Sequence, residues 1–226
     1  MTTLFLIRHA TNDSIKDGIL AGWLPGVHIN DEGRQQAEQM AARMGQVKLD
    51  AVYSSPLERA VETAEYLARP RGLEIQPRDG LGEIRVGAWE NRKIEELNKT
   101  DEWRMYQLFP SVSRPPGGES GRELQMRAVG EVESICAAHT EGNVAVVSHA
   151  DTLGVVVAHY AGIHLDLFQR LVVSPASVTV IWIGPHGPRL IRLNDAGPLD
   201  DIQPPRKPVE KSEEQGKEVE NAVRDF

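Results

Sequence analysis

The sequence contains a single cysteine, Cys136, among its 226 residues. One cysteine excludes a disulfide within the chain, and the absence of disulfides is typical of a reducing compartment. No apolar run approaches the roughly 20 residues that a membrane-spanning helix needs. The first residues run straight into Arg8 with no basic leader, so we expect no signal peptide, no membrane contact and a cytoplasmic location.

Positive charge is also scarce. The chain has 25 lysines and arginines against 33 aspartates and glutamates, which gives a formal net charge of -8 at pH 7. This balance argues against non-specific binding to nucleic acid. An anionic substrate would have to be held by a local group of arginines against an unfavourable overall field.

Several catalytic signatures are missing as well. The sequence has no Gly-x-Ser-x-Gly, no Walker loop and no Gly-x-Gly-x-x-Gly. His149 and Asp151 have a metal-like spacing, but no third ligand accompanies them and no His-Glu-x-x-His exists. We therefore expect no metal site.

Strand patterns occur throughout the first 200 residues. Residues 4–7 and 143–148 are apolar runs without alternation, which is typical of strands buried on both faces of a parallel sheet. Residues 50–53 indicate another strand, and two more are expected within residues 169–193, around Pro175.

Helical patterns separate these strands. One helix is expected after the N-cap Asn30, one after residues 55–58, one from about residue 119 to 139, and one that ends at Gly162. Residues 55–58, Ser-Pro-Leu-Glu, have the spacing of a capping box with Ser55 as N-cap. The alternation predicts an α/β protein, a three-layer α/β/α sandwich with a mostly parallel sheet and helices on both faces.

Two stretches depart from this alternation. Residues 80–118 are irregular and contain a Pro-Pro-Gly-Gly break at 115–118, so we expect short helices and loops that form a small cap over the sheet. From about residue 201, proline, glutamate and lysine dominate. We predict one domain over residues 1–200, with the cap at about 80–118, and a charged, proline-containing C-terminal tail over residues 201–226.

Charged and imidazole side chains stand at the ends of three predicted strands. Arg8 and His9 follow the first strand, His149 follows the strand at 143–148, and Arg59 lies on the first turn of the helix after the strand at 50–53. Ligands of open α/β sheets bind at the carboxyl ends of the strands. Arginine forks match phosphate oxygens, and helix N-termini add backbone N–H donors. The pattern predicts a phosphate-binding pocket.

Five segments in order resemble one family. Arg8-His9-Ala10-Thr11 resembles the signature of the histidine phosphatase (phosphoglycerate mutase-like) superfamily. Residues 54–64, 81–90, 116–120 and 147–150 are similar to that family's later motifs, and the match spans roughly residues 3–194 by motif register.

The resemblance implies a phosphomonoester hydrolase that forms a phosphohistidine. His9 would be the nucleophile, and Glu83 would protonate the leaving alkoxide and then help to activate water. The implied substrate-binding residues are Arg8, Arg59, His149, Asn12 and Ala150. Many members of the family carry an asparagine several residues after the nucleophile. Here Asn12 or Ser14 would take over its contact with the phosphate. No metal or cofactor is implied, because arginines and a histidinium supply the positive charge.

Two other functions use the same residues. A phosphoglycerate mutase would return the phosphoryl group to a reoriented intermediate, but residues 87–92 and 113–116 match the mutase stretches only faintly. An inactive phospho-ligand-binding protein is disfavoured by the complete set of His9, Arg59, Glu83 and His149. The substrate is a small phosphorylated molecule, with sugar phosphates, phosphoglycerates and nucleotide-pathway phosphates all open. A homodimer is expected only because twofold symmetry is common.

Overall fold

A six-stranded sheet forms the centre of the protein in the computed structural model, which describes residues 1–197. The predicted tail from residue 201 lies outside the described residues. The strand order is β3-β2-β4-β1-β5-β6. The strands are β1 (Thr2–Arg8), β2 (Ala51–Ser54), β3 (Ile75–Pro77), β4 (Gly142–Ser148), β5 (Val178–Gly184) and β6 (Gly187–Asp195).

Successive apolar residues of the central strands enter two different cores. In β1, Leu4 and Leu6 belong to one buried cluster and Ile7 belongs to the other. In β4, Val144 and Val146 belong to the first cluster, while Ala145 and Val147 belong to the second. Side chains alternate across a strand, so an unbroken apolar run requires a layer on each face.

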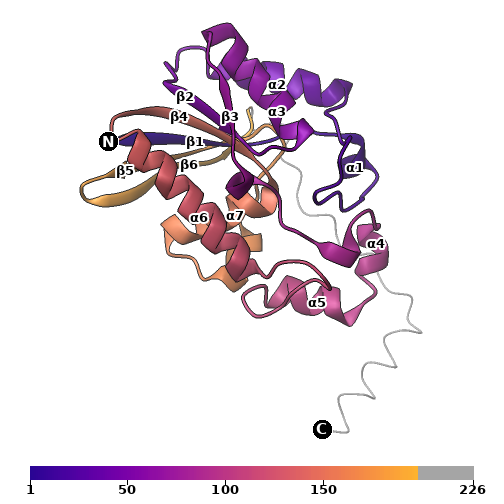
Figure 1. Ribbon diagram of the computed structural model, residues 1–226. Helices are drawn as coiled ribbons and strands as arrows, with labels where there is room; N and C mark the ends of the chain where they lie inside the picture. The colour runs from indigo at the N-terminus through magenta and orange to yellow at the C-terminus, as the bar shows by residue number, and fades with distance from the viewer. Residues whose placement is uncertain (198–226) are drawn as a thin grey trace, which may run out of the picture.

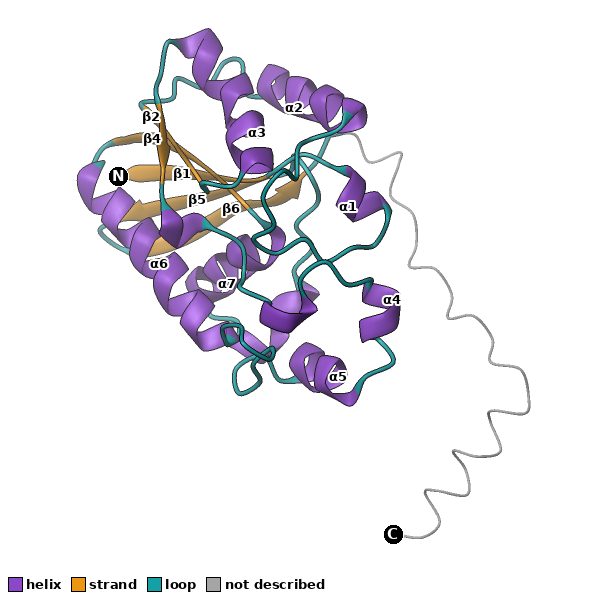
Figure 2. Ribbon diagram, turned by 45° about the vertical axis from the view of Figure 1, so that its right-hand side comes forward, coloured by secondary structure: helices purple, strands orange, loops and turns teal. Residues whose placement is uncertain are grey.

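Helices supply those two layers (Figures 1 and 2). On one face lie α2 (Asp31–Arg43) and α3 (Glu58–Ala68), and on the other lie α6 (Gly121–Ala138) and α7 (Ala150–Ala161). Asn30 caps α2 through a bond from the Gly33 N–H, and Gly162 ends α7 with a φ of 68°. The three-layer α/β/α sandwich predicted from the sequence is confirmed.

The sheet is parallel on one side only. Strands β3, β2, β4 and β1 run parallel to one another, whereas β5 pairs with both β1 and β6 in antiparallel fashion. The two late strands begin at Val178, later than expected, because residues 165–170 form the 3-10 helix η4 (Leu165–Arg170). Pro175 and Ala176, whose φ is 53°, then turn the chain into β5.

The capping box expected at residues 55–58 is wrong. Helix α3 begins at Glu58, and its N-cap Leu57 has no side-chain bond. The Ser55 hydroxyl instead lies 2.7 Å from Nε2 of His149. A capping box does form at α6, between Ser120 and Glu123.

Residues 79–118 consist of short helices joined by loops. They are η2 (Asp79–Leu81), η3 (Gly87–Trp89), α4 (Ile94–Leu97) and α5 (Asp101–Leu108), while α1 (Asp13–Lys16) follows β1. The ring centroids of Trp103 and Tyr106 lie 5.3 and 5.5 Å from that of Trp89, so aromatic edges pack the interior of this segment.

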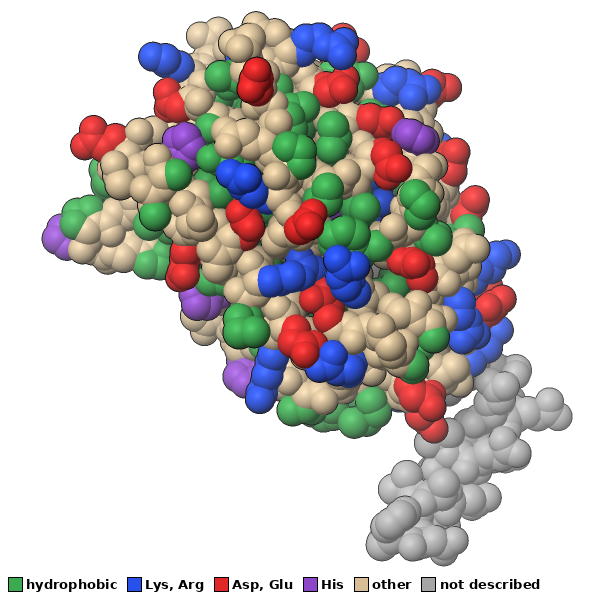
Figure 3. Space-filling model, in the orientation of Figure 1, with side chains coloured by type: hydrophobic (Ala, Val, Ile, Leu, Met, Phe, Trp, Pro, Cys, Tyr) green, Lys and Arg blue, Asp and Glu red, His purple; other side chains and the backbone are tan. Residues whose placement is uncertain are grey.

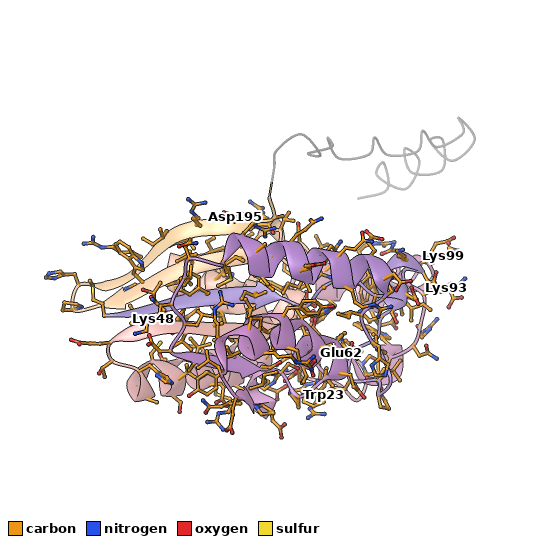
Figure 4. The ribbon with its side chains drawn as sticks, turned by 90° about the horizontal axis from the view of Figure 1, so that it is seen from above. Trp23, Lys48, Glu62, Lys93, Lys99 and Asp195 are labelled. Atoms are coloured by element: carbon orange, nitrogen blue, oxygen red, sulfur yellow. The ribbon has the colours of Figure 1, made fainter. Side chains whose placement is uncertain are left out.

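This segment lies at the end of the sheet where β1, β2 and β4 finish. The Ser148 hydroxyl at the end of β4 donates to the Leu81 carbonyl at 2.6 Å. Figure 4 shows Lys48, just before β2, at the opposite end of the molecule from Lys93 and Lys99. The carboxyl ends of the parallel strands therefore point toward residues 79–118.

The surface carries both signs of charge. On the face drawn in Figure 3, basic and acidic side chains are interspersed and no broad area of one sign is present. Among residues 1–197, no helix has the length and apolar character needed to cross a membrane.

Candidate active site

The strand register brings the predicted site residues together at the carboxyl ends of β1, β2 and β4. Arg8 pairs with Ser148 across β1 and β4, and Ser54 pairs with Val147 across β2 and β4. The residues that follow, His9, Ser55 and His149, therefore leave three neighbouring strands at the same edge. The convergence expected from the sequence follows directly from this alignment.

His9 is fixed by its backbone and by its ring. Its N–H donates to the Ser148 carbonyl at 2.8 Å, and the next N–H, of Ala10, donates to Thr63 Oγ1 at 3.0 Å. The ring Nδ1 lies 2.8 Å from the Ala10 carbonyl oxygen, which can only accept a hydrogen bond. Nδ1 therefore carries the proton in the neutral ring, and Nε2 holds the free lone pair.

A cavity of about 220 Å³ opens beside this ring. Six of the predicted site residues line it: Arg8, His9, Asn12, Arg59, Glu83 and Ala150. The predicted residues are thus brought together from β1, α3, α7 and the loop after η2.

Each of the two arginines has a buried nitrogen without a hydrogen-bond acceptor in the described part of the chain. Arg8 Nη1 donates to the Val173 carbonyl at 2.7 Å, and Arg59 Nη2 donates to the Gly22 carbonyl at 2.7 Å. Arg8 Nε and Arg59 Nη1 are buried with no hydrogen-bond partner among the described residues. A buried guanidinium N–H without an acceptor costs free energy, so this pair is suited to an anion in the cavity.

His149 lies behind the cavity surface. Its ring is fully buried, and its centroid is 5.0 Å from that of His9 with the planes at 62°. Ser55 holds Nε2, whereas Nδ1 has no partner among residues 1–197. His149 therefore supports the His9 ring edge-on.

The pKa values of both imidazoles are lowered well below their ordinary value. Burial is the main cause for each, and the positive charges of Arg59 and Arg8 add to it. The protein groups alone thus favour neutral rings, which differs from the histidinium expected from the sequence. A neutral His9 retains the lone pair that a nucleophile needs, and a phosphate dianion beside the rings would raise both pKa values.

Asn12 and Ala150 lie at the N-terminal ends of two helices, α1 and α7. Asn12 is buried, and its Oδ1 accepts from the Ile15 N–H at 3.0 Å, which caps α1 and leaves its NH₂ as the remaining donor. Ala150 is the first residue of α7, where backbone N–H groups have no helical acceptor.

A network of backbone contacts holds Glu83. Arg127 of α6 donates to the carbonyls of Gly80, Gly82 and Glu83 at 3.0, 2.9 and 2.8 Å, and the Trp23 indole also donates to the Glu83 carbonyl. A Cβ at residue 82 would lie 2.1 Å from the Trp23 ring, so this position requires glycine.

The Glu83 carboxyl is oriented as well. Oε1 accepts from the Ile84 N–H at 2.9 Å and lies 3.2 Å from the Thr152 hydroxyl. These contacts direct one oxygen toward α7 and leave Oε2 free of any hydrogen bond in the described part of the chain. Both the backbone and the side chain of Glu83 are therefore fixed.

A second carboxyl, Asp151, lines the same cavity. Burial, and then the neighbouring charge of Glu83, raise its pKa from 3.8 to about 7, although Arg8 opposes the shift. The cavity lining therefore brings two arginines and two carboxyls together, and the pKa of Asp151 depends on neighbours of both signs.

Sequence reasoning assigned no role to Asp151 or Arg127. Asp151 follows His149 by two residues on the first turn of α7, a signal that could have placed it at the strand ends. Arg127 lies within α6, 44 residues from Glu83, so no local pattern could have linked it to the loop that carries Glu83. No group of three or more potential metal ligands occurs among residues 1–197.

Comparisons with known proteins agree with this geometry. The family model described as "Histidine phosphatase superfamily (branch 1)" matches residues 4–196. Phosphoserine phosphatase 1 of Hydrogenobacter thermophilus is 29% identical over 86% of this chain and 92% of its own length. "Probable phosphoglycerate mutase GpmB" of Escherichia coli is 29% identical over 90% of this chain and all of its own. The solved structure of Bacillus stearothermophilus YhfR superposes with a TM-score of 0.81 at 29% identity, covering 86% of this chain and 98% of that one.

The raised pKa of Asp151 predicts a pH-dependent stability. The folded state holds the proton more tightly than the unfolded chain, so this contribution is complete below pH 3.8 and is lost as the pH rises toward 7. We expect Asp151→Asn to match the natural protein at pH 4 and to be more stable by roughly 1–3 kcal/mol at pH 8. Urea unfolding at both pH values measures the difference. Asp17→Asn, at an exposed site, is the control, and equal stability at pH 8 would contradict the assignment.

The Arg127 contacts predict a loss of activity that depends on the leaving group. Arg127→Ala removes three donors from the loop that carries Glu83, so proton delivery should fall, with kcat lower by about 10²-fold for an alkyl phosphate. An aryl phosphate with an acidic leaving group needs little protonation and should lose much less. Arg122→Ala, an exposed change on the same helix, is the matched control. Equal losses for both esters would show that Arg127 does not position Glu83.

Proposed function

The chain belongs to the histidine phosphatase superfamily (branch 1), and from this we propose that it hydrolyses a small phosphate monoester through a phosphohistidine formed on His9. One observation carries the proposal: His9 Nδ1 is tied to the Ala10 carbonyl, which leaves Nε2 as the nucleophilic nitrogen in a cavity where two arginines have unused N–H groups. The relatives named as phosphatases support the same reaction class.

In the first step, the lone pair of His9 Nε2 attacks phosphorus and the P–O bond to the organic group breaks. Arg8 and Arg59 donate to the non-bridging oxygens through the nitrogens that have no protein acceptor, which offsets charge in the transition state. Glu83 gives its proton to the departing alkoxide, and an alcohol leaves.

In the second step, water attacks the phosphohistidine. Glu83, now a carboxylate, takes a proton from that water, the P–N bond breaks and inorganic phosphate forms, with the lone pair returned to His9 Nε2. Asn12, His149 and Ala150 complete the proposed phosphate-binding set. The burial that keeps both imidazoles neutral between turnovers allows His9 to react again near pH 7.

Four statements stay predictions from the sequence: the domain boundary, the cap at about 80–118, the cytoplasmic location and a homodimer. The cap assignment is supported by Val86 and Ile94, which line the cavity from this segment.

The nucleophile assignment predicts a stable label that depends on His9. Rapid-quench experiments with a ³²P-labelled aryl phosphate should trap phosphate on the natural protein in base-stable, acid-labile form. His9→Ala should give no label and reduce kcat by at least about 10³-fold. His186→Ala, an exposed histidine in the β5–β6 turn, should behave as the natural protein. Labelling that survives His9→Ala would refute the nucleophile.

The hydrolase and mutase functions predict different products. GpmB is as similar to this chain as the phosphoserine phosphatase is, so the mutase stays a second candidate. We expect the natural protein to release phosphate from esters. It should interconvert 3- and 2-phosphoglycerate no faster than the His9→Ala variant does. Interconversion that exceeds phosphate release would establish the mutase, and purified protein that neither labels nor releases phosphate would indicate a binding protein.

A further inference from the structure

Part of the cavity lining is an apolar wall. It is made by Ile15, Ile19, Leu20, Val86 and Ile94, from the segments after β1 and η2 and from α4. Ile94 is 36% exposed and therefore forms the rim, whereas Val86 is buried. An organic group attached to a phosphate held by Arg8 and Arg59 would share a cavity of about 220 Å³ with this apolar wall.

Backbone hydrogen bonds fix the apolar wall in place. The Ile94 N–H donates to the Gly18 carbonyl at 2.8 Å, the Leu20 N–H donates to the Arg92 carbonyl at 2.9 Å, and the Asn91 N–H donates back to the Leu20 carbonyl at 2.9 Å. Two segments 70 residues apart in sequence are thus joined edge to edge, with a bridge between Ile19 and Lys93. The apolar wall is therefore preformed, which lowers the entropic cost of binding an organic group to it.

No cation faces this wall among the described lining residues other than Arg8 and Arg59. Two basic side chains on the adjoining segments, Lys16 and Arg85, are engaged elsewhere. Lys16 pairs with Glu32 at 2.9 Å, and Arg85 stacks on the Trp23 ring at 3.9 Å. Figure 4 shows Lys93 at the outer end of the molecule.

The remaining charged side chains of the cavity are acidic. Glu83 and Asp151 line the same cavity as the apolar wall, and both interact electrostatically with Arg8. A substrate carboxylate in this cavity would lie near these two acidic side chains and would find no cation other than the two arginines to replace its water. An uncharged organic group meets neither cost.

We infer that the preferred substrate is a phosphate monoester whose organic part is uncharged and apolar, without a carboxylate near the ester oxygen. This inference rests on the proposed hydrolase function and narrows it. It separates this chain from the substrates in its relatives' names, since phosphoserine and phosphoglycerate both carry a carboxylate.

A matched pair of esters tests this class. Phenyl phosphate and 4-carboxyphenyl phosphate differ only by the carboxylate, and the carboxylate makes the phenol a slightly better leaving group, which biases the comparison against the inference. We expect kcat/KM for phenyl phosphate to be higher by about tenfold or more. n-Butyl phosphate should exceed phosphoserine and 3-phosphoglycerate in the same assay.

A cation placed on the apolar wall should reverse the preference. Ile94→Lys should shift the kcat/KM ratio toward 4-carboxyphenyl phosphate by about tenfold, because the new ammonium pairs with the carboxylate. Ile191→Lys on β6 makes the same change at a site of similar exposure, 43% against 36%, outside the cavity, and should leave the ratio unchanged.

The outcomes are distinct. If the natural protein releases phosphate from the carboxylate-bearing esters with a kcat/KM equal to or greater than that for the uncharged esters, the inference is overturned. The hydrolase function would then still stand. If neither ester releases phosphate and His9 is not labelled, the proposed function fails and takes the inference with it. The comparison on the natural protein decides the question even if Ile94→Lys does not fold.

Discussion

Two buried guanidinium groups beside two buried imidazoles form the constraint on which this site depends. Backbone carbonyls of Val173 and Gly22 accept one hydrogen bond from each arginine and so hold the positive charge in place without neutralising it. Burial, and then the charges of the two arginines, lower the pKa values of His9 and His149, and the Ala10 carbonyl fixes the tautomer of His9. A phosphate dianion would satisfy the unused N–H groups, so the charges that help burial to keep the nucleophile neutral also attract its substrate.

The sheet makes this concentration of charge possible. In a parallel arrangement the carboxyl ends of β1, β2 and β4 finish at one edge, and their register sets Arg8 beside Ser148 and Ser54 beside Val147. The strands are buried on both faces by helices, so their ends have little freedom to move. The Ser55 hydroxyl then joins the site to the start of α3, because it contacts His149 Nε2 at 2.7 Å and accepts from the Leu57 N–H at 3.3 Å.

The acidic side of the cavity is assembled differently. Glu83 lies on a loop, and its position depends on Arg127 from α6 and on the Trp23 ring, which come from distant parts of the chain. Asp151 stands near Glu83 because α7 begins directly after His149. The cavity lining consequently combines two arginines, two carboxyls and an apolar wall. This combination connects the proposed proton transfer to the proposed choice of substrate.

The sequence by itself determined the α/β sandwich and the residues at the strand ends, because apolar runs, caps and motifs such as Arg8-His9 are local features that report on local structure. It did not reveal β3, three residues with proline and no apolar run, nor the true start of β5. Only the tertiary structure decided the partner of Ser55, the support from Arg127 and the raised pKa of Asp151. Each of these depends on groups from separate elements meeting in a buried, low-dielectric place, and no local pattern encodes such a meeting.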